Sequence, residues 1–245
     1  MRAMGITGFG KSGKTTLVCA LADTLEARGL RVAVAKSSGH ALDMAGTDTQ
    51  RCFKPGRTVL AVSRDGTGEA MIRWGEGRRL LDLLPLIDAD IVLVEGGKQL
   101  GCLPRVLCLR DPHEANDLNH GLAVATWGDT GAPGIPAFAP EGADGAGDLN
   151  TLTDLVMDKA FLLPGLNCGA CGEGDCAGLA RRIVHGQRRP ADCAALHGEI
   201  TVTINGRQVA LNPFTSRLLA GGVRGMLAAL KGYAPGGEAE LRLKC

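Results

Sequence analysis

The segment Gly8–Thr15, which reads GFGKSGKT, constrains the fold of this chain more than any other feature. It fits the pattern G-x4-G-K-[ST], and it lies between an apolar stretch, Ala3–Thr7, and an amphipathic stretch, Lys14–Arg28. In such a context, the N–H groups of the loop and of the helix N-terminus point at a bound anion. The sequence therefore predicts a strand, a phosphate-binding loop and a helix at the start of an α/β domain.

Residues 3–160 alternate short apolar stretches with amphipathic ones, which is typical of strand-helix-strand units in a mostly parallel sheet. We predict strands at Ala3–Thr7, Arg31–Ala35, Thr58–Ser63, Asp90–Val94, Val106–Leu109, Leu122–Ala125 and Ile135–Phe138. Helices are predicted at Lys14–Arg28, Gly77–Leu86 and Leu149–Ala160, with an antiparallel pair involving Arg64–Trp74. The expected fold class is α/β, that of a P-loop nucleoside triphosphatase.

We divide the chain into a nucleotide-binding domain over residues 1–160, a four-cysteine module over residues 161–197 and a small unit over residues 198–245. In the last unit, Asn205-Gly206 predicts a hairpin turn, Asn212-Pro213 starts a helix, and Glu238–Lys244 alternates like a strand, which gives a ββαβ order. The helix carries five large apolar residues on one face: Phe214, Leu218, Met226, Leu227 and Leu230. So short a unit buries little surface alone, and we expect it to pack on the rest of the protein or on a partner.

The phosphate loop assigns roles to its own residues. Lys14 is expected to reach the β- and γ-phosphates and Thr15 to ligate Mg²⁺. The nucleotide contacts expected from the loop are Gly8, Gly10, Lys11, Ser12, Gly13, Lys14, Thr15 and Thr16.

A carboxylate that organises the metal is needed at the carboxyl edge of the sheet, where ligands bind in open α/β folds. Asp90 and Glu95 flank one predicted strand and lie about 17 Å apart along it, so only one of them faces the nucleotide. Glu95 stands at the carboxyl end, beside Gly96-Gly97-Lys98, and we assign it the catalytic role together with Lys14 and Thr15. Lys98 is included among the nucleotide contacts.

The sequence gives little indication of which nucleotide base is bound. No N-K-x-D element occurs, and the nearest counterpart after a strand is Ala125–Asp129, where Asp129 is a candidate for pairing with guanine. Asp48 follows the second predicted strand and is a candidate Mg²⁺ or water ligand, although a simple turn aspartate is an equal alternative. His40 is a weaker candidate for contacting substrate.

Four cysteines, Cys168, Cys171, Cys176 and Cys193, stand in the order C-x2-C-x4-C-x16-C. Four thiolates at such spacing suit a [4Fe-4S] cluster, and the glycines between them let the backbone wrap closely around it. Zinc remains the alternative, although zinc ribbons usually have two C-x2-C pairs, and unmetallated thiols remain a third. Three roles are open for the nearby arginines: to offset cluster charge, to dock an acidic partner, or simply to form a solvated helix face. These arginines are Arg181, Arg182, Arg188 and Arg189.

Composition excludes several classes of protein. The net charge of +1 does not call for nucleic acid or an anionic membrane as partner, and no apolar run approaches a membrane span. With no visible signal peptide, we expect a cytoplasmic protein with reduced thiols. Four scattered cysteines are read as core residues, Cys19, Cys52, Cys102 and Cys108, and Cys245 as a free thiol.

Three segments together, Gly8–Thr16, Gly46–Thr49 and Asp90–Lys98, resemble the MobB family, the GTP-binding adapters of molybdopterin-guanine dinucleotide biosynthesis. The resemblance spans roughly residues 3–160. It implies binding of GTP and Mg²⁺, slow GTP hydrolysis, and partnership with a MobA-like nucleotidyltransferase or with molybdopterin. The chain departs from the family at Gly97, where a bulky residue is frequent.

The stretch from Leu163 to Cys176 resembles the four-cysteine iron-sulfur domain of corrinoid iron-sulfur proteins and of the Rnf electron-transport complex. The simplest MobB proteins lack this domain. Three functions therefore compete: an adapter for the molybdenum or tungsten cofactor, an ATP-dependent electron donor to a redox partner, and a small-molecule kinase or ligase with structural zinc. A homodimer is compatible with all three.

Overall fold

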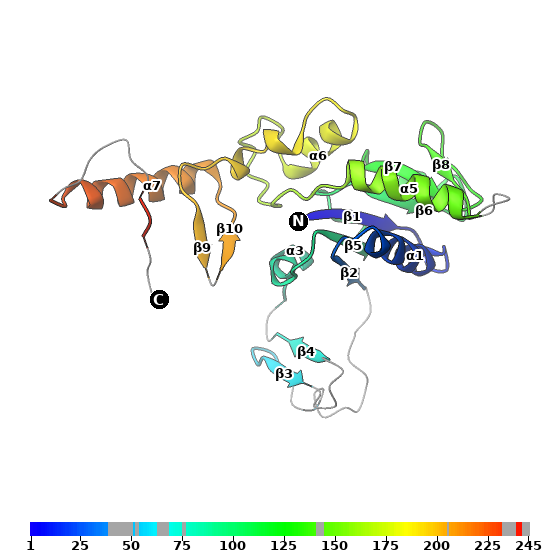
Figure 1. Ribbon diagram of the computed structural model, residues 1–245, viewed down its shortest axis with the longest axis horizontal. Coiled ribbons are helices and arrows are strands. Elements are labelled where there is room, and N and C mark those ends of the chain that lie inside the picture. The colour runs from blue at the N-terminus through cyan, green and yellow to red at the C-terminus, as the bar shows by residue number, and fades with distance from the viewer. Residues whose placement is uncertain are drawn as a thin grey trace.

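A six-stranded parallel sheet lies at the centre of this computed structural model (Figure 1). The structure describes residues 1–38, 51, 54–62, 69–74, 77–140, 145–204, 206–231 and 239–241. The strands are β1 (Arg2–Thr7), β2 (Val32–Ser37), β5 (Ile91–Gly96), β6 (Arg105–Cys108), β7 (Ala123–Trp127) and β8 (Ala137–Phe138). Their order is β2-β5-β1-β6-β7-β8, which confirms the predicted parallel α/β fold.

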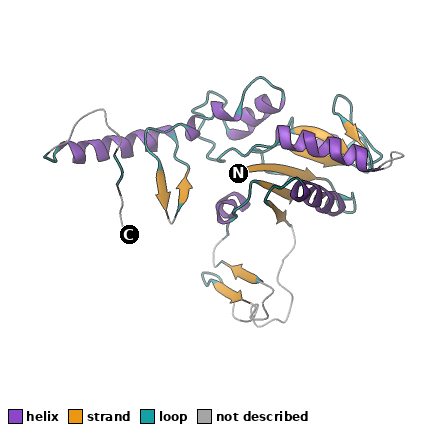
Figure 2. Ribbon diagram, in the orientation of Figure 1, coloured by secondary structure: helices purple, strands orange, loops and turns teal. Residues whose placement is uncertain are grey.

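Helices α1 (Lys14–Ala27) and α5 (Gly145–Lys159) cover one face of the sheet (Figure 2). Successive side chains of a strand point to opposite faces, so Met4 and Ile6 of β1 pack on this side against Leu21 of α1 and Val156 of α5. All four side chains are fully buried. Because both faces of a parallel sheet are covered, its strands are almost continuously apolar, which is why they were visible in the sequence.

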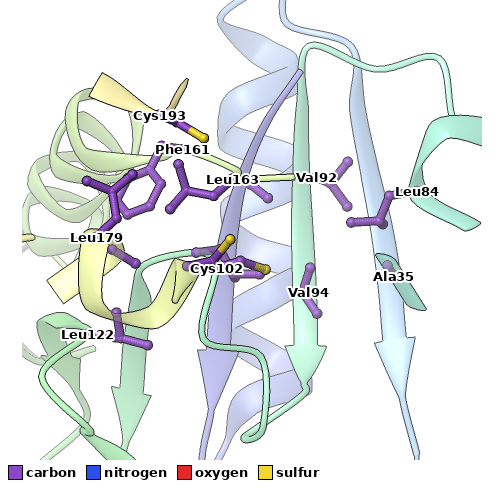
Figure 3. Close-up of a cluster of buried hydrophobic side chains, with 14 of the residues drawn as sticks. Ala35, Leu84, Val92, Val94, Cys102, Leu122, Phe161, Leu163, Leu179 and Cys193 are labelled. Atoms are coloured by element: carbon purple, nitrogen blue, oxygen red, sulfur yellow. The ribbon is translucent and has the colours of Figure 1, made fainter. Parts of the chain in front are cut away.

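The opposite face is covered by short elements and by the cysteine module. Helix α3 (Leu80–Leu83), the 3-10 turn η1 (Leu84–Leu86) and helix α6 (Cys176–Val184) belong to this layer. Phe161, Leu163 and Leu179 belong to one buried cluster with the strand residues Val92 and Val94, as labelled in Figure 3. The cysteine module therefore packs on the sheet as part of the main core.

The connection between β5 and β6, residues 97–104, crosses this face without a helix. Arg105, the first residue of β6, holds it in place, with only 2% of its surface exposed. Its guanidinium donates to the carbonyls of Lys98 (3.1 Å), Leu100 (2.8 Å) and Leu118 (2.8 Å), the last of which ends helix α4 (Glu114–Leu118). These bonds offset the cost of burying an unpaired charge.

The cysteine module continues into a projecting C-terminal unit (Figure 1). The 3-10 turns η2 (Pro190–Asp192) and η3 (Ala194–Leu196) lead to the hairpin β9 (Val202–Ile204) and β10 (Arg207–Val209), followed by α7 (Pro213–Ala228). The Asn212 side chain accepts from the Thr215 N–H at 2.8 Å, as expected of a helix cap. No helix among the described residues is long and apolar enough to cross a membrane.

The large apolar side chains of α7 are exposed on this chain. Phe214 and Met226 are 72% and 66% exposed, whereas the smaller Ser216 and Ala220 are buried. The helix extends away from the sheet (Figure 1), so the described chain leaves Phe214 and Met226 uncovered, and packing of this unit on a partner stays a prediction. Residues 239–241 form no strand, and the rest of the predicted strand Glu238–Lys244 lies outside the described residues.

The predicted strand Thr58–Ser63 is confirmed as β3 (Val59–Val62), which pairs antiparallel with β4 (Ala70–Arg73), inside the segment Arg64–Trp74, in a separate two-stranded sheet. Two other predictions need correction. The predicted helix Gly77–Leu86 is reduced to α3 and η1, because Pro85 lacks the N–H that a longer α-helix needs. Cys19 is exposed, since α1 buries Leu17, Val18, Leu21 and Leu25 instead, whereas Cys102 and Cys108 are buried as expected.

Replacement of Arg105 by Ala should destabilise the protein by about 3–5 kcal/mol, because one buried and two partly buried carbonyls would lose their donors. Urea unfolding followed by circular dichroism measures this change. Arg31→Ala is the control, since that arginine pairs with Asp88 and Asp90 at the surface and its loss should matter far less. Equal effects of the two substitutions would contradict the role given to Arg105.

Candidate functional site

The phosphate loop leaves β1 at the carboxyl edge of the sheet, between β5 and β6. Gly8 is required there, because a Cβ atom would lie 2.4 Å from both the Cys108 carbonyl oxygen and the Ser12 hydroxyl. Gly13 has a φ of 80° and Lys11 has a φ of 61°, so the chain turns twice through the left-handed region. This path curls the loop over the start of α1.

The first turn of α1 is free to bind an anion. Gly13 caps the helix and offers no side chain to the first N–H groups, and the first turn contains no acidic residue. These N–H groups and the helix dipole therefore remain available to a phosphate. Lys14 reaches back along the loop and donates to the Phe9 carbonyl at 2.5 Å.

Glu95 and Thr15 meet as predicted for a metal site. The Thr15 hydroxyl donates to Glu95 Oε1 at 3.1 Å, and only 10% of the Glu95 side chain is exposed. The two residues come from neighbouring elements, since α1 follows β1 and β1 pairs with β5. A hydroxyl and a carboxylate at a phosphate loop are suitable oxygen ligands for Mg²⁺, directly or through water.

Lys36 completes this group, and the sequence did not single it out. Its ammonium lies 3.0 Å from Glu95 Oε1, because Lys36 and Glu95 are opposite each other in the pairing of β2 with β5. The strand order would have been needed to predict the contact. Asp90, by contrast, lies at the other edge, where hydrogen bonds from Arg31 lower the pKa of its carboxyl to about 2.

The turn after Glu95 places a second cation at the loop. Gly96 and Gly97 both have positive φ values, 85° and 65°, and a Cβ on Gly96 would lie 2.6 Å from the Ser37 carbonyl oxygen. The chain therefore turns sharply, and the Lys98 ammonium lies 3.6 Å from the centre of the Phe9 ring.

The other residues predicted to contact the nucleotide or substrate lie in different parts of the structure or outside the described residues. Gly10, Ser12 and Thr16 lie in the loop and the first turn of α1. Asp129 is exposed and follows β7, which is separated from β1 by β6. His40 and Asp48 lie outside the described residues.

The cysteine segment wraps through left-handed backbone. Asn167, Gly169, Gly172 and Gly174 all have positive φ values, as the glycine pattern suggested. The Cys176 N–H donates to Asn167 Oδ1 at 3.1 Å, and the Asn167 N–H lies 3.4 Å from Cys176 Sγ. Asp175 caps α6 by accepting from the Gly178 N–H, so Cys176 is fixed at a helix start.

All four cysteines, Cys168, Cys171, Cys176 and Cys193, line one pocket with apolar walls that include Leu166 and Leu179. Burial raises the pKa of the Cys193 thiol, while a hydrogen bond with the Ala195 backbone lowers it. The other three thiols are near enough that their negative charge raises this pKa further. Four thiols that line one pocket with apolar walls suit an iron-sulfur cluster. No three Cys, His, Asp or Glu residues within the described ranges converge on one metal-ion position.

Two of the arginines around this module face a carboxylate. Arg182 and Arg188 lie 3.2 Å and 3.8 Å from the carboxylate of Glu173. His185 is exposed, and its Nδ1 lies 2.7 Å from the Arg181 carbonyl oxygen. Any compensation of cluster charge by Arg182 or Arg188 is therefore partly offset by Glu173.

A protein-family model described as molybdopterin guanine dinucleotide synthesis protein B, MobB, matches residues 3–127, just over half of the chain. The chain belongs to the MobB family. A second model, described as "Putative Fe-S cluster", matches residues 163–195 and so includes all four cysteines.

Individual relatives are similar to different lengths of this chain. A Methanocaldococcus jannaschii protein named "Putative molybdopterin-guanine dinucleotide biosynthesis adapter protein" is 24% identical over 238 residues, covering 95% of this chain and 93% of that protein. The Haemophilus influenzae adapter protein is 37% identical over 112 residues, or 44% of this chain and 62% of that protein. The solved Bacillus subtilis MobB structure covers 65% of this chain and 98% of its own, at 21% identity and a TM-score of 0.49.

Native protein treated with iodoacetamide at pH 8 should be modified at Cys19 and not at Cys108. Cys19 is exposed, whereas Cys108 is buried, and burial raises the pKa of its thiol to about 12, so only about one thiol in 10,000 is ionised at pH 8. Peptide mass spectrometry measures both positions. In 8 M urea, the two cysteines should react alike, and rapid labelling of native Cys108 would contradict its burial under the phosphate loop.

Proposed function

We propose that this MobB-family chain is a GTP-binding accessory protein of molybdenum or tungsten cofactor biosynthesis, which assists the attachment of GMP to molybdopterin. The observation that carries the proposal is the contact of Thr15 with Glu95 beside an open helix N-terminus. That arrangement offers a phosphate site and a metal site within one loop. It lies inside the segment matched by the MobB model.

The roles follow from the geometry. Lys14 would neutralise the β- and γ-phosphates, while Thr15 and Glu95 would hold Mg²⁺, and slow GTP hydrolysis would occur at these three residues. Lys98 would add a further positive charge, and Asp129 is the candidate for reading guanine. The partner would be a MobA-like nucleotidyltransferase or molybdopterin itself, in the cytoplasm.

We further propose that Cys168, Cys171, Cys176 and Cys193 hold one [4Fe-4S] cluster. Their shared pocket and the family model over residues 163–195 support this assignment over zinc. Bound there, the cluster would supply one-electron chemistry, with the left-handed loop donating N–H groups to its sulfurs.

A second function, nucleotide-gated electron donation to a redox partner, is favoured by one contact. The connection that follows Glu95 reaches the cysteine module, where a Cβ on Gly101 would lie 2.7 Å from that of Ala177. The next residue, Cys102, accepts a 2.9 Å bond from the Leu163 N–H. A nucleotide at Glu95 and a cluster at Cys176 would therefore be joined by one short segment.

GTP should bind at least about tenfold more tightly than ATP, and only with Mg²⁺ present, in calorimetric titrations of the full chain. Lys14→Ala should abolish this binding and any hydrolysis while preserving the fold, because one charge-assisted phosphate contact is lost from a surface loop. Lys159→Ala is the matched control, since Lys159 pairs with Asp158 at the end of α5.

Tighter binding of ATP than of GTP would overturn the adapter proposal and favour the electron-donor function. Unchanged binding in Lys14→Ala would show that the loop is not the nucleotide site.

Anaerobically purified protein should be brown and should contain about four irons per chain, with absorption near 400 nm. Cys193→Ser should lose or degrade the cluster, because it removes a buried ligand, whereas Cys19→Ser should retain it. Iron, sulfide and zinc analysis provides the measurement. A colourless protein with one zinc per chain would sink the cluster assignment but leave the nucleotide proposal standing.

A further inference from the structure

Arg110 lies at the mouth of the phosphate loop, although the sequence pattern gave it no role. It follows β6, the strand beside β1, at the same edge of the sheet as the loop. Its Nη1 donates to the Gly10 carbonyl at 3.2 Å, and its guanidinium lies 5.7 Å from the centre of the Phe9 ring. Phe9 therefore has Arg110 and Lys98 as neighbouring cations.

Glu114 orients this arginine. Its carboxylate accepts from Arg110 Nε at 2.7 Å and from the Arg110 backbone N–H at 3.0 Å, and only 12% of its side chain is exposed. The Arg110 side chain itself remains 52% exposed. A guanidinium held on one edge by a buried carboxylate keeps its other N–H groups directed outward, because the group is a rigid planar fork.

Two cations bond neighbouring carbonyls of the loop. Lys14 bonds the carbonyl of Phe9, and Arg110 bonds that of Gly10, the next residue. In loops of this pattern the lysine addresses the β- and γ-phosphates. Phosphate oxygens are stronger acceptors than carbonyls, so a bound triphosphate would draw both cations away from the loop backbone.

We propose that Arg110 contacts the terminal phosphate of the bound triphosphate, so that it favours GTP over GDP and stabilises its hydrolysis. This inference rests on the proposed GTP function. In hydrolysis, the water oxygen bonds to the γ-phosphorus while the bond from that phosphorus to the β–γ bridging oxygen breaks. The electron pair stays on the β-phosphate, the proton lost by the attacking water passes to bulk solvent, and Arg110 offsets the negative charge on the transferred group.

The test compares the affinities of a non-hydrolysable GTP analogue and of GDP, both with Mg²⁺, for the full chain and its variants. Arg110→Ala should weaken the analogue at least about tenfold and GDP less than about threefold, since only the triphosphate carries the contact. Arg79→Ala is the control and should change neither affinity. Arg79 bonds Asp82 through its backbone N–H, Nε and Nη2, much as Arg110 bonds Glu114, but lies in the helical segment before β5.

Equal weakening of the binding of both nucleotides in Arg110→Ala would mean that the arginine only fixes the Gly10 carbonyl, and this result would overturn the proposal. Unchanged affinities for both nucleotides would overturn it too. If Arg110→Ala fails to fold, Arg110→Lys decides, since an ammonium keeps the charge but cannot bond Glu114 and a phosphate along two edges. That variant should lose at least about threefold in the preference for the triphosphate, and an unchanged preference overturns the proposal. If the wild type binds neither nucleotide, the GTP function fails, and this proposal fails with it.

Discussion

The buried guanidinium of Arg105 is the interaction on which the arrangement of both candidate sites depends. Burial lowers the pKa of this arginine, and no carboxylate among the described residues offsets its charge. Its hydrogen bonds fix two carbonyls of the connection between β5 and β6 and one at the end of α4. A connection held in this way needs no helix of its own, and the sheet face beside it is left for the cysteine module.

The nucleotide site is built from the carboxyl ends of neighbouring parallel strands. β1 delivers the loop, β5 delivers Glu95, β2 delivers Lys36 and β6 delivers Arg110. Because these strands are parallel, their carboxyl ends meet at one edge of the sheet, where side chains far apart in the sequence come into contact. The site is therefore rich in cations, and Glu95 is the carboxylate that Thr15 and Lys36 share.

The cysteine module is attached to this domain through its core. Leu179, from the helix that Cys176 begins, packs in the same cluster as Val92 and Val94, the strand residues that lead to Glu95 (Figure 3). Tight packing transmits small shifts between such neighbours, so occupancy of one site has a physical route to the other. The C-terminal helix α7 is different, since its large apolar side chains are exposed and take no part in this core.

The sequence by itself determined the local chemistry. The path of the Gly8–Thr15 loop permits only glycine at Gly8, and the glycines among the cysteines predicted a close wrap of the backbone, which the structure forms through left-handed residues. Short apolar runs likewise identified the central strands, because burial on two faces of the sheet imposes such runs. The contacts of Lys36 and Arg110 were decided only by the tertiary structure, since they depend on which strands are neighbours. The exposure of Phe214 was also hidden, because an apolar helix face has the same sequence pattern whether or not another surface covers it.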